Sequence, residues 1–171
     1  HRDLHSFPTR RSSDLTKNAT IYEVNIRQYT NEGTFIAFKS HLPRLKKMGV
    51  DILWLMPIHP IGIENRKGTK GSYYSVQNYT DVNKEFGTKE DFKQLVKEIH
   101  NNNMLVIIDW VANHTAWDNP WIKSNPEWYT KDSAGKIIPS VPDWTDVADL
   151  NFDNTERSEE HTSELQSRQS I

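Results

Sequence analysis

The chain has 171 residues, a formal net charge of -2 at pH 7 and no cysteine, which excludes disulfide bonds and metal sites with cysteine ligands. The charge is too small to indicate a polyanionic partner, and the basic residues are scattered, so nucleic acid is not expected as a partner. No apolar run approaches the roughly 20 residues of a membrane-spanning helix, so no membrane segment is visible.

The two ends of the chain differ in character from the sequence between them. Residues 1–15, HRDLHSFPTRRSSDL, resemble the translation of a short-read sequencing adapter, and RSEEHTSELQS, within residues 157–171, resembles its partner. We therefore expect both ends to be artefacts and leave them out of the fold prediction. The opening HRDL is similar to the catalytic loop of a protein kinase, but Pro8 occupies the place of the asparagine that such a loop needs.

The first predicted elements are a strand, a helix and a second strand. Residues 21–29 alternate apolar and polar side chains and are rich in β-formers, which predicts a strand. A helix should follow and end near Gly49, with Pro43 expected to kink or split it. Its apolar stripe consists of Phe35, Phe38, Leu42 and Leu45. The apolar run at residues 51–58 then predicts a second, buried strand that is parallel to the first.

A long polar loop and a second helix separate this strand from a third. Residues 61–86 form the loop, and loops of this length usually carry function. Thr88 begins a capping box, and apolar residues at helical spacing extend the helix to about Asn102. The run LVII at residues 105–108 predicts a third strand, buried on both faces. This alternation of strands and helices is typical of a parallel α/β sheet with right-handed crossovers.

Polar side chains gather directly after the third predicted strand. Asp109, Asn113 and His114 follow its last apolar residue within six positions. Proteins with parallel α/β sheets place their active sites at the carboxyl ends of the strands. This arrangement predicts a functional site at the end of the third strand.

After His114 the hydrophobic periodicity stops, and residues 117–154 form an irregular segment. The segment is rich in large aromatic residues, among them Trp117, Trp121, Trp128, Tyr129 and Trp144. Packing into a small core is the favoured interpretation of these rings. Stacking against a sugar is the alternative for one or two of them, because flat rings suit the apolar faces of pyranoses.

Several motifs together resemble those of the α-amylase family of glycoside hydrolases, family 13. Residues 109–114, DWVANH, are similar to the family's first signature region, at the end of its third strand. Residues 148–151, ADLN, resemble the short signature in the family's domain B. Residues 74–79 and 85–88 look like the segment that leads into the family's second helix. The order and spacing of these motifs carry the resemblance, which covers residues 19–154.

The resemblance implies an α/β fold, a partial (β/α)8 TIM barrel with its first three strands and two helices. Residues 16–114 would form this first part of the catalytic barrel. Residues 115–156 would form the start of the irregular domain B in the loop between the third strand and the third helix. A closed barrel of this type takes about 250 residues and eight strands, so we expect the chain to be an amino-terminal fragment.

The resemblance also implies roles for five residues. Tyr74 would stack against the sugar on the non-reducing side of the cleaved bond, and His114 would hydrogen-bond to that sugar. Asn113 and Asp149 would each give one oxygen to a structural calcium ion, which takes roughly six to eight. Asp109 would orient its neighbours. Considered without the family, Tyr74 and His114 also suit ordinary packing, and Asp109 suits hydrogen bonds to backbone amides.

The carboxylates that would carry the reaction are not visible in the chain. Retaining glycosidases need two, about 5 Å apart, and in this family they follow the fourth and fifth strands. Asp143, Asp146 and Asp153 lie in an irregular loop and are not assigned this role. We expect the parent protein to hydrolyse α-1,4-glucosidic bonds of α-glucan or malto-oligosaccharide with retention, and this fragment by itself to be inactive.

Two alternatives to the hydrolase remain open. The first is a transglycosylase or α-1,6-glucosidase of the same family. The second, from a different functional class, is a non-catalytic amylase-like protein such as a transporter-associated ectodomain. Tyr74 and His114 favour the enzyme, because an inactive site has little use for sugar contacts. For the location of the protein, the extracellular space or periplasm is favoured over the cytoplasm.

Overall fold

The computed structural model describes residues 17–154, so the predicted adapter-like ends at residues 1–15 and 157–171 lie outside the described residues. The chain forms two compact units. Of the described residues, the first unit contains 17–56 and 90–108, and the second contains the remainder. Within this described part, no helix is both long enough and apolar enough to cross a bilayer.

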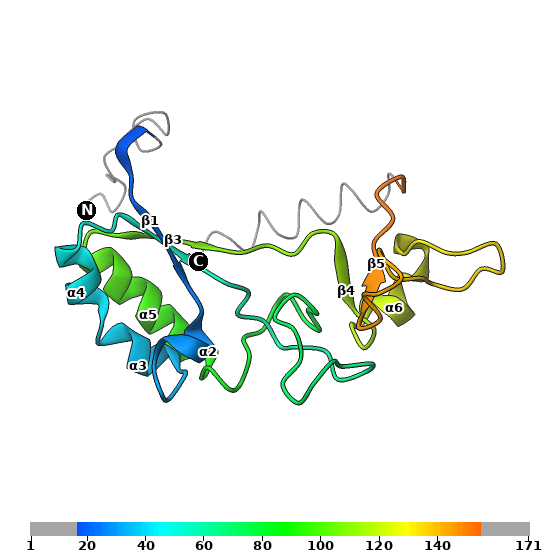
Figure 1. The fold of residues 1–171 in the computed structure, drawn as a ribbon, viewed down its shortest axis with the longest axis horizontal. Helices are drawn as coiled ribbons and strands as arrows, with labels where there is room; N and C mark the ends of the chain where they lie inside the picture. The colour runs from blue at the N-terminus through cyan, green and yellow to red at the C-terminus, as the bar shows by residue number, and fades with distance from the viewer. Residues whose placement is uncertain (1–16, 155–171) are drawn as a thin grey trace, which may run out of the picture. The chain divides into compact units, whose positions relative to one another are not determined.

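A three-stranded parallel sheet forms the first unit together with its helices (Figure 1). The strands are β1 (Ile21–Val24), β2 (Ile52–Leu55) and β3 (Leu105–Ile108), in the order β1-β2-β3. Both pairings are parallel, and Ile21, Ile52 and Leu105 lie side by side across the sheet. The predicted parallel α/β arrangement is therefore confirmed for these three strands.

The first strand is shorter than the sequence predicts. β1 ends at Val24, and the short helix α2 (Ile26–Tyr29) occupies the rest of the expected strand. The carbonyl of Asn25 accepts hydrogen bonds from the amides of Gln28 (3.1 Å) and Tyr29 (2.9 Å). The prediction of one strand over residues 21–29 is wrong, because one helical turn buries Ile26 as well as a strand would.

The first predicted helix is split, as expected from its proline. It consists of α3 (Phe35–Lys39) and α4 (Leu42–Lys47). The side chain of Thr34 caps α3 by accepting a hydrogen bond from the amide of Ala37 (3.2 Å). Pro43 lies in the first turn of α4, where its missing N–H leaves no helical hydrogen bond unmade.

Only one face of the parallel sheet is buried. Val24, Leu53 and Leu55 point to the buried face, and Figure 1 shows α3, α4 and α5 (Lys89–Asn101) along one side of the strands. On the opposite face, Leu105 is 43% and Ile107 is 47% exposed. The prediction that the third strand is buried on both faces is wrong for this chain, because Leu105, Ile107 and also Ile108, which is 39% exposed, are not buried.

The second unit contains a two-stranded antiparallel sheet that the sequence did not predict. Its strands are β4 (His114–Ala116) and β5 (Val147–Asp149), with His114 opposite Asp149. Between them lie α6 (Trp121–Ser124) and the 3-10 helix η1 (Pro126–Trp128). Elements of three or four residues are too short to show a hydrophobic period, so the sequence predicted an irregular segment over residues 117–154.

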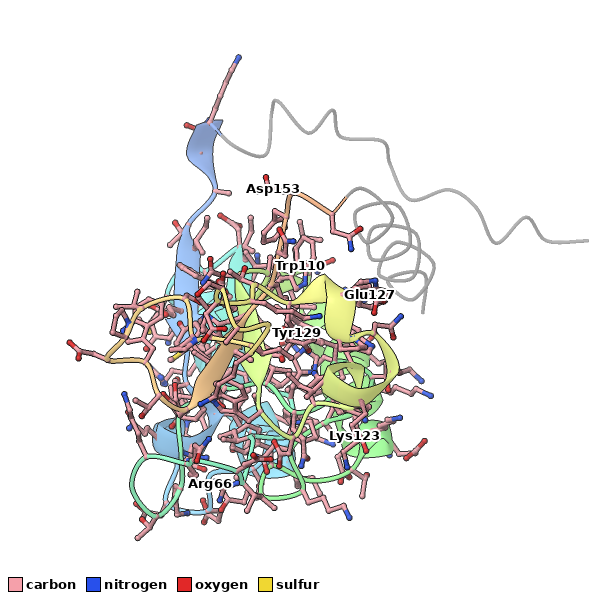
Figure 2. The ribbon with its side chains drawn as sticks, turned by 90° about the vertical axis from the view of Figure 1, so that its right-hand side faces the viewer. Arg66, Trp110, Lys123, Glu127, Tyr129 and Asp153 are labelled. Atoms are coloured by element: carbon pink, nitrogen blue, oxygen red, sulfur yellow. The ribbon has the colours of Figure 1, made fainter. Side chains whose placement is uncertain are left out.

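Most of the aromatic residues of this segment pack into a small core. Trp128 and Tyr129 are buried with Ala148 and Leu150, and the hydroxyls of Tyr129 and Thr115 hydrogen-bond at 2.9 Å (Tyr129 is labelled in Figure 2). The partly buried residues around this cluster are Trp117, Trp121, Ile122 and Ile137. The packing prediction is confirmed for four of the five aromatic residues. Trp144 is the exception, with 45% of its surface exposed.

Candidate functional site

The predicted sugar-stacking residue Tyr74 lies at the end of a closed loop in the second unit. Ile61 and Val76 form an antiparallel bridge, and the amide of Gly62 donates to the carbonyl of Ser75 (2.9 Å), which holds the loop ends together. Tyr74 is 38% exposed, and its hydroxyl donates to Oδ2 of Asp109 at 3.0 Å. The structure therefore brings together two of the predicted site residues, with the carboxylate orienting the phenol.

His114, the second predicted sugar contact, is only 8% exposed. Its Nδ1 lies 3.1 Å from the side-chain amide nitrogen of Asn113. Because an amide nitrogen only donates, Nδ1 must accept, and the ring proton is then on Nε2. The ring also hydrogen-bonds to the backbone of Tyr74. His114 thus connects Tyr74 and Asn113 and has its polar atoms satisfied within the protein.

Burial lowers the pKa of His114 from its ordinary value of 6.5, although the Tyr74 backbone and the carboxylates of Asp146 and Asp149 act in the opposite direction. Burial also lowers the pKa of His59 in the same unit. Below pH 6.5 the unfolded chain therefore binds protons that the folded chain does not. Both side chains stay neutral in the fold at pH 7.

We expect the free energy of unfolding to fall as the pH is lowered from 6.5 through the depressed pKa values of these two histidines. Urea unfolding between pH 7.5 and about 5 measures this loss. The His114→Gln variant should lose less stability over this range, because it lacks one of the two groups. The matched variant His100→Gln, at an exposed position on α5, should lose as much stability as the unsubstituted chain. If the free energy of unfolding fell equally with pH in all three proteins, the loss could not be assigned to His114.

The two predicted calcium ligands lie close to each other across the antiparallel sheet. The carbonyl of Asn113 accepts a hydrogen bond from the amide of Leu150 (3.1 Å), the residue after Asp149. The side-chain nitrogen of Asn113 donates to Oγ of Ser140 (2.9 Å) as well as to His114. Its amide oxygen is then left for another partner. Within residues 17–154 no group of three His, Cys, Asp or Glu side chains is arranged to hold a metal ion.

Tyr79 fixes the backbone of the segment that carries Asn113 and His114. Its hydroxyl is 2.7 Å from the carbonyl of Val111 and 3.0 Å from the carbonyl of His114. Its ring stacks on Trp121 with centroids 5.2 Å apart and an interplanar angle of 19°. Tyr79 is the last residue of the motif at residues 74–79. Its hydrogen bonds to the Val111 and His114 carbonyls explain why a tyrosine is needed at this position.

Replacing Tyr79 by phenylalanine should destabilise the chain by about 1–2 kcal/mol, because the carbonyls of Val111 and His114 lose the one hydroxyl proton that they share, while the ring stack remains. Urea unfolding measures the loss. Tyr79→Leu, which also removes the stack on Trp121, should cost more. A Tyr79→Phe variant as stable as the unsubstituted chain would show that water replaces the hydroxyl without cost.

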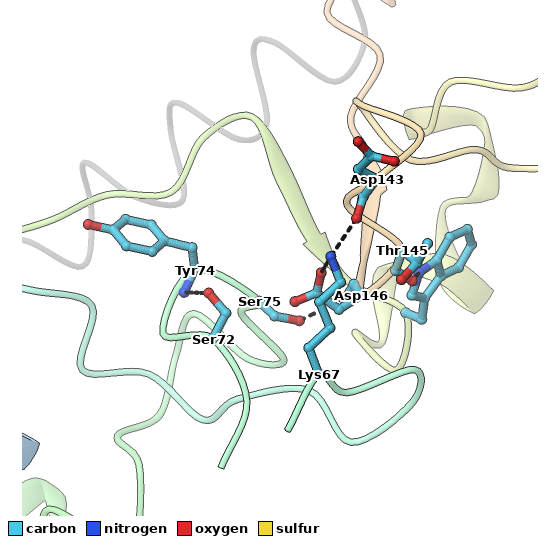
Figure 3. Close-up of polar contacts among 8 residues, drawn as sticks. Lys67, Ser72, Tyr74, Ser75, Asp143, Thr145 and Asp146 are labelled. Carbon is cyan, nitrogen blue, oxygen red and sulfur yellow. Dashed lines mark hydrogen bonds and ion pairs between the residues drawn. The ribbon is translucent and has the colours of Figure 1, made fainter. Parts of the chain in front are cut away.

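A buried carboxylate near the site was not anticipated. Asp146 has 8% of its side chain exposed, and its Oδ1 lies 3.5 Å from Nζ of Lys67. Lys67 also donates to the carbonyl of Asp143, and Oγ of Ser75 donates to the carbonyl of Asp146 at 2.9 Å (Figure 3). The carboxylate thus holds a loop in place, and its role depends on a lysine far away in the sequence, which no local motif indicates.

The five predicted residues form one connected group in the second unit. Tyr74 contacts Asp109 and the ring of His114. His114 contacts Asn113 and pairs with Asp149 across the sheet. The structure adds two features that sequence reasoning missed, the Lys67–Asp146 ion pair and an edge contact between the rings of His114 and Trp144.

Comparison with known proteins identifies the family of the chain. The model of the family described as "Alpha amylase, catalytic domain" matches residues 9–150, which is most of the chain. The chain belongs to the α-amylase family. This family contains glycoside hydrolases and transglycosylases on a TIM-barrel type of α/β fold, and the parallel sheet of the first unit agrees with that class.

Individual α-amylase family members share a quarter to two fifths of their aligned residues with the chain. "Alpha-amylase 3" of Dictyoglomus thermophilum is 31% identical over 84% of the chain and 32% of its own length. An α-1,4-glucan:maltose-1-phosphate maltosyltransferase of Picrophilus torridus is 32% identical over 71% of the chain and 22% of its own length. The crystal structure of an α-amylase from Lactobacillus plantarum is 41% identical, with a TM-score of 0.83 over 86% of the chain and 35% of its own. The chain thus spans about a third or less of these relatives.

Proposed function

We propose that the chain supplies the first part of the catalytic barrel and the start of domain B to a longer enzyme that hydrolyses α-1,4-glucosidic bonds of α-glucans with retention. The observation that carries the proposal is the connected group of Tyr74, Asp109 and His114. A partly exposed phenol held by a carboxylate offers a flat apolar ring beside hydrogen-bonding groups. This combination suits a pyranose, which has apolar faces and polar edges.

In this proposal Tyr74 stacks against the sugar and Asp109 keeps its ring in place through the 3.0 Å hydrogen bond. His114 presents Nε2–H near the same position, and a sugar hydroxyl would replace the backbone of Tyr74 as its partner. The ring is neutral at pH 7 because burial lowers its pKa. A neutral imidazole donates from Nε2 while Nδ1 stays bound to Asn113, so binding requires no change of tautomer.

The exposed face of the parallel sheet supports the barrel part of the proposal. Leu105 and Ile107 are large apolar side chains on that face, and the interior of a TIM barrel is filled by such side chains from successive strands. We infer that this face is the inner wall of the barrel. The carboxylates that would attack and protonate the glycosidic bond belong to the later strands in this proposal.

A transfer reaction is the second candidate. The relative from Picrophilus torridus is named as a maltosyltransferase, and transfer and hydrolysis share the first, covalent half of a retaining mechanism. The two differ in whether water or a second sugar accepts the glycosyl group. A non-catalytic amylase-like protein is a weaker candidate, since it gives no reason for the contact between Tyr74 and Asp109.

Product analysis with the longer protein tests the proposal. Incubation with maltoheptaose should yield shorter malto-oligosaccharides without products longer than the substrate, and isomaltotriose should remain uncut. Longer products would favour the transferase, and cleavage of isomaltotriose would favour the α-1,6-glucosidase. No reaction with either sugar would contradict an enzymatic function.

Calcium fits the chemistry of Asn113 and Asp149 as part of a larger ligand set. The amide oxygen of Asn113 and the carboxylate of Asp149 are hard oxygen donors, and the amide nitrogen of Asn113 is turned towards Ser140 and His114. We propose that these two residues hold a calcium ion whose role is to tie the loops together. Two donors are short of the roughly six to eight that calcium takes, so other oxygens must complete the site.

Calcium should raise the melting temperature of the longer protein, because an ion that binds only the folded state stabilises it, by about 2.7 kcal/mol at a hundred times its Kd. Thermal unfolding with 5 mM calcium and with a chelator measures the difference. Asp149→Asn should reduce the response, and the matched Asp153→Asn, at an exposed carboxylate, should keep it. An identical melting temperature with and without calcium would contradict the site.

A further inference from the structure

Trp144 differs from the other tryptophans of its segment, Trp117, Trp121 and Trp128, in being exposed. Trp117, Trp121, Trp128 and Tyr129 all belong to the packed core of the second unit or to its border. Trp144 has 45% of its surface exposed, so the apolar core does not account for its presence. A single exposed tryptophan needs no explanation by itself, and its surroundings decide what it does.

The backbone around Trp144 is held by contacts of its neighbours Asp143, Thr145 and Asp146, which are labelled in Figure 3. Lys67 binds the carbonyl of Asp143 and the carboxylate of Asp146. Nε1 of Trp117 donates to the carbonyl of Thr145 at 3.0 Å. The amide of Trp144 itself donates to the carbonyl of Val141 at 2.8 Å, which closes a turn.

These contacts act on residues immediately before and after Trp144. The ring therefore sits on a fixed backbone, and ordering it on a ligand costs little additional entropy. A fixed, exposed aromatic ring is what a stacking platform requires.

The exposed ring of Trp144 lies next to His114, the proposed sugar contact. The rings of Trp144 and His114 meet edge to face, with centroids 5.7 Å apart and an interplanar angle of 72°. His114 in turn is hydrogen-bonded to the backbone of Tyr74. A line of contacts thus runs from the carboxylate of Asp109 through Tyr74 and His114 to Trp144.

We propose that Trp144 is a second stacking platform, which binds a glucose ring of an α-glucan beside the position served by Tyr74 and His114. The inference rests on the proposed function and extends it to a specificity-determining residue. The indole offers the largest flat apolar surface among the side chains. Because it adjoins His114, it binds a sugar adjacent to the one that His114 contacts and so favours chains over single glucose units.

The test uses fluorine NMR of the 171-residue chain labelled with 5-fluorotryptophan. The chain has six tryptophans, and the signal missing from the Trp144→Phe variant identifies Trp144. Titration with maltotriose should shift this signal and leave that of Trp128, buried in the core, in place. The β-linked cellotriose serves as the matched sugar control.

The same titration gives the effect of substitution on affinity. Trp144→Ala should weaken maltotriose binding roughly three- to tenfold, as expected for the loss of one aromatic stack. Trp144→Phe should stay within about threefold, because it keeps a flat ring. Phe152→Ala, at another exposed aromatic residue of the second unit, should bind as the unsubstituted chain.

The outcomes separate this inference from the proposed function. If maltotriose shifts the ring signals of His114 but not the fluorine signal of Trp144, the platform is refuted while the proposed function stands. If maltotriose shifts no signal of the unsubstituted chain, the proposed sugar site itself is refuted. An equal response to cellotriose would overturn the assignment of an α-linked ligand.

Discussion

Replacing His114 by alanine is expected to lower kcat/KM of the proposed longer enzyme on maltoheptaose about 100-fold, the typical effect of removing one hydrogen-bond donor from a reacting site. The variant loses the Nε2 donor together with the support that the imidazole gives to Asn113 and Trp144. Initial rates over a range of maltoheptaose concentrations measure the effect and separate kcat from KM.

The matched variant of His114 is glutamine, whose side-chain amide keeps an N–H donor at a similar reach. We expect kcat/KM of His114→Gln to be about tenfold higher than that of His114→Ala, because the amide restores part of the hydrogen bonding without the ring. Near-ultraviolet circular dichroism shows whether the tryptophan packing of each variant is intact. Rates within threefold of the unsubstituted enzyme for an intact His114→Ala variant would show that the histidine only packs.

Replacing Gly62 by alanine is expected to reduce the free energy of unfolding by about 3 kcal/mol, the upper end of the usual cost of overpacking. A Cβ atom at this position would lie 2.3 Å from Cβ of Ala116 and 2.9 Å from Oδ1 of Asp118. Ala116 is fully buried in β4, so the loop and the strand must move apart to relieve the contact. Both form part of the unit that carries the site.

Urea unfolding of the Gly62→Ala chain measures this loss, with Gly68→Ala as the control. A Cβ atom at Gly68 would meet no atom within 4 Å, and the left-handed backbone there (φ +65°) should cost the control only about 1 kcal/mol. The difference between the free energies of unfolding of the two variants gives the cost of the contact with Ala116. Equal losses would mean that β4 and the loop separate without cost.

The parallel sheet was predictable because β2 and β3 are continuous apolar runs flanked by clear breakers. The sequence did not reveal that β3 has an exposed face, since an apolar run reads the same whether or not its second face is covered. The helical turn α2 was also missed, because one buried isoleucine, Ile26, fits a strand or a helix. β4 and β5 have three residues each, too few for any period to be read.

The candidate site was predictable where its residues lie in contiguous motifs. Asp109, Asn113 and His114 fall within six positions, and the structure links them to Tyr74 and Asp149. Trp144 was not separable from the four other aromatic residues, because only burial distinguishes it. The pairing of Lys67 with Asp146 joins segments far apart in the chain, which a single sequence does not indicate.

The anomeric configuration of the first product tests the central claim most directly. We propose that the α-amylase family chain belongs to a retaining enzyme with an α-glucan site, so proton NMR of a fresh reaction of the longer protein with maltoheptaose should show the α-anomer first. The β-anomer should appear only later, as the product mutarotates. Initial formation of the β-anomer would contradict a retaining mechanism, and intact maltoheptaose after prolonged incubation would contradict the account as a whole.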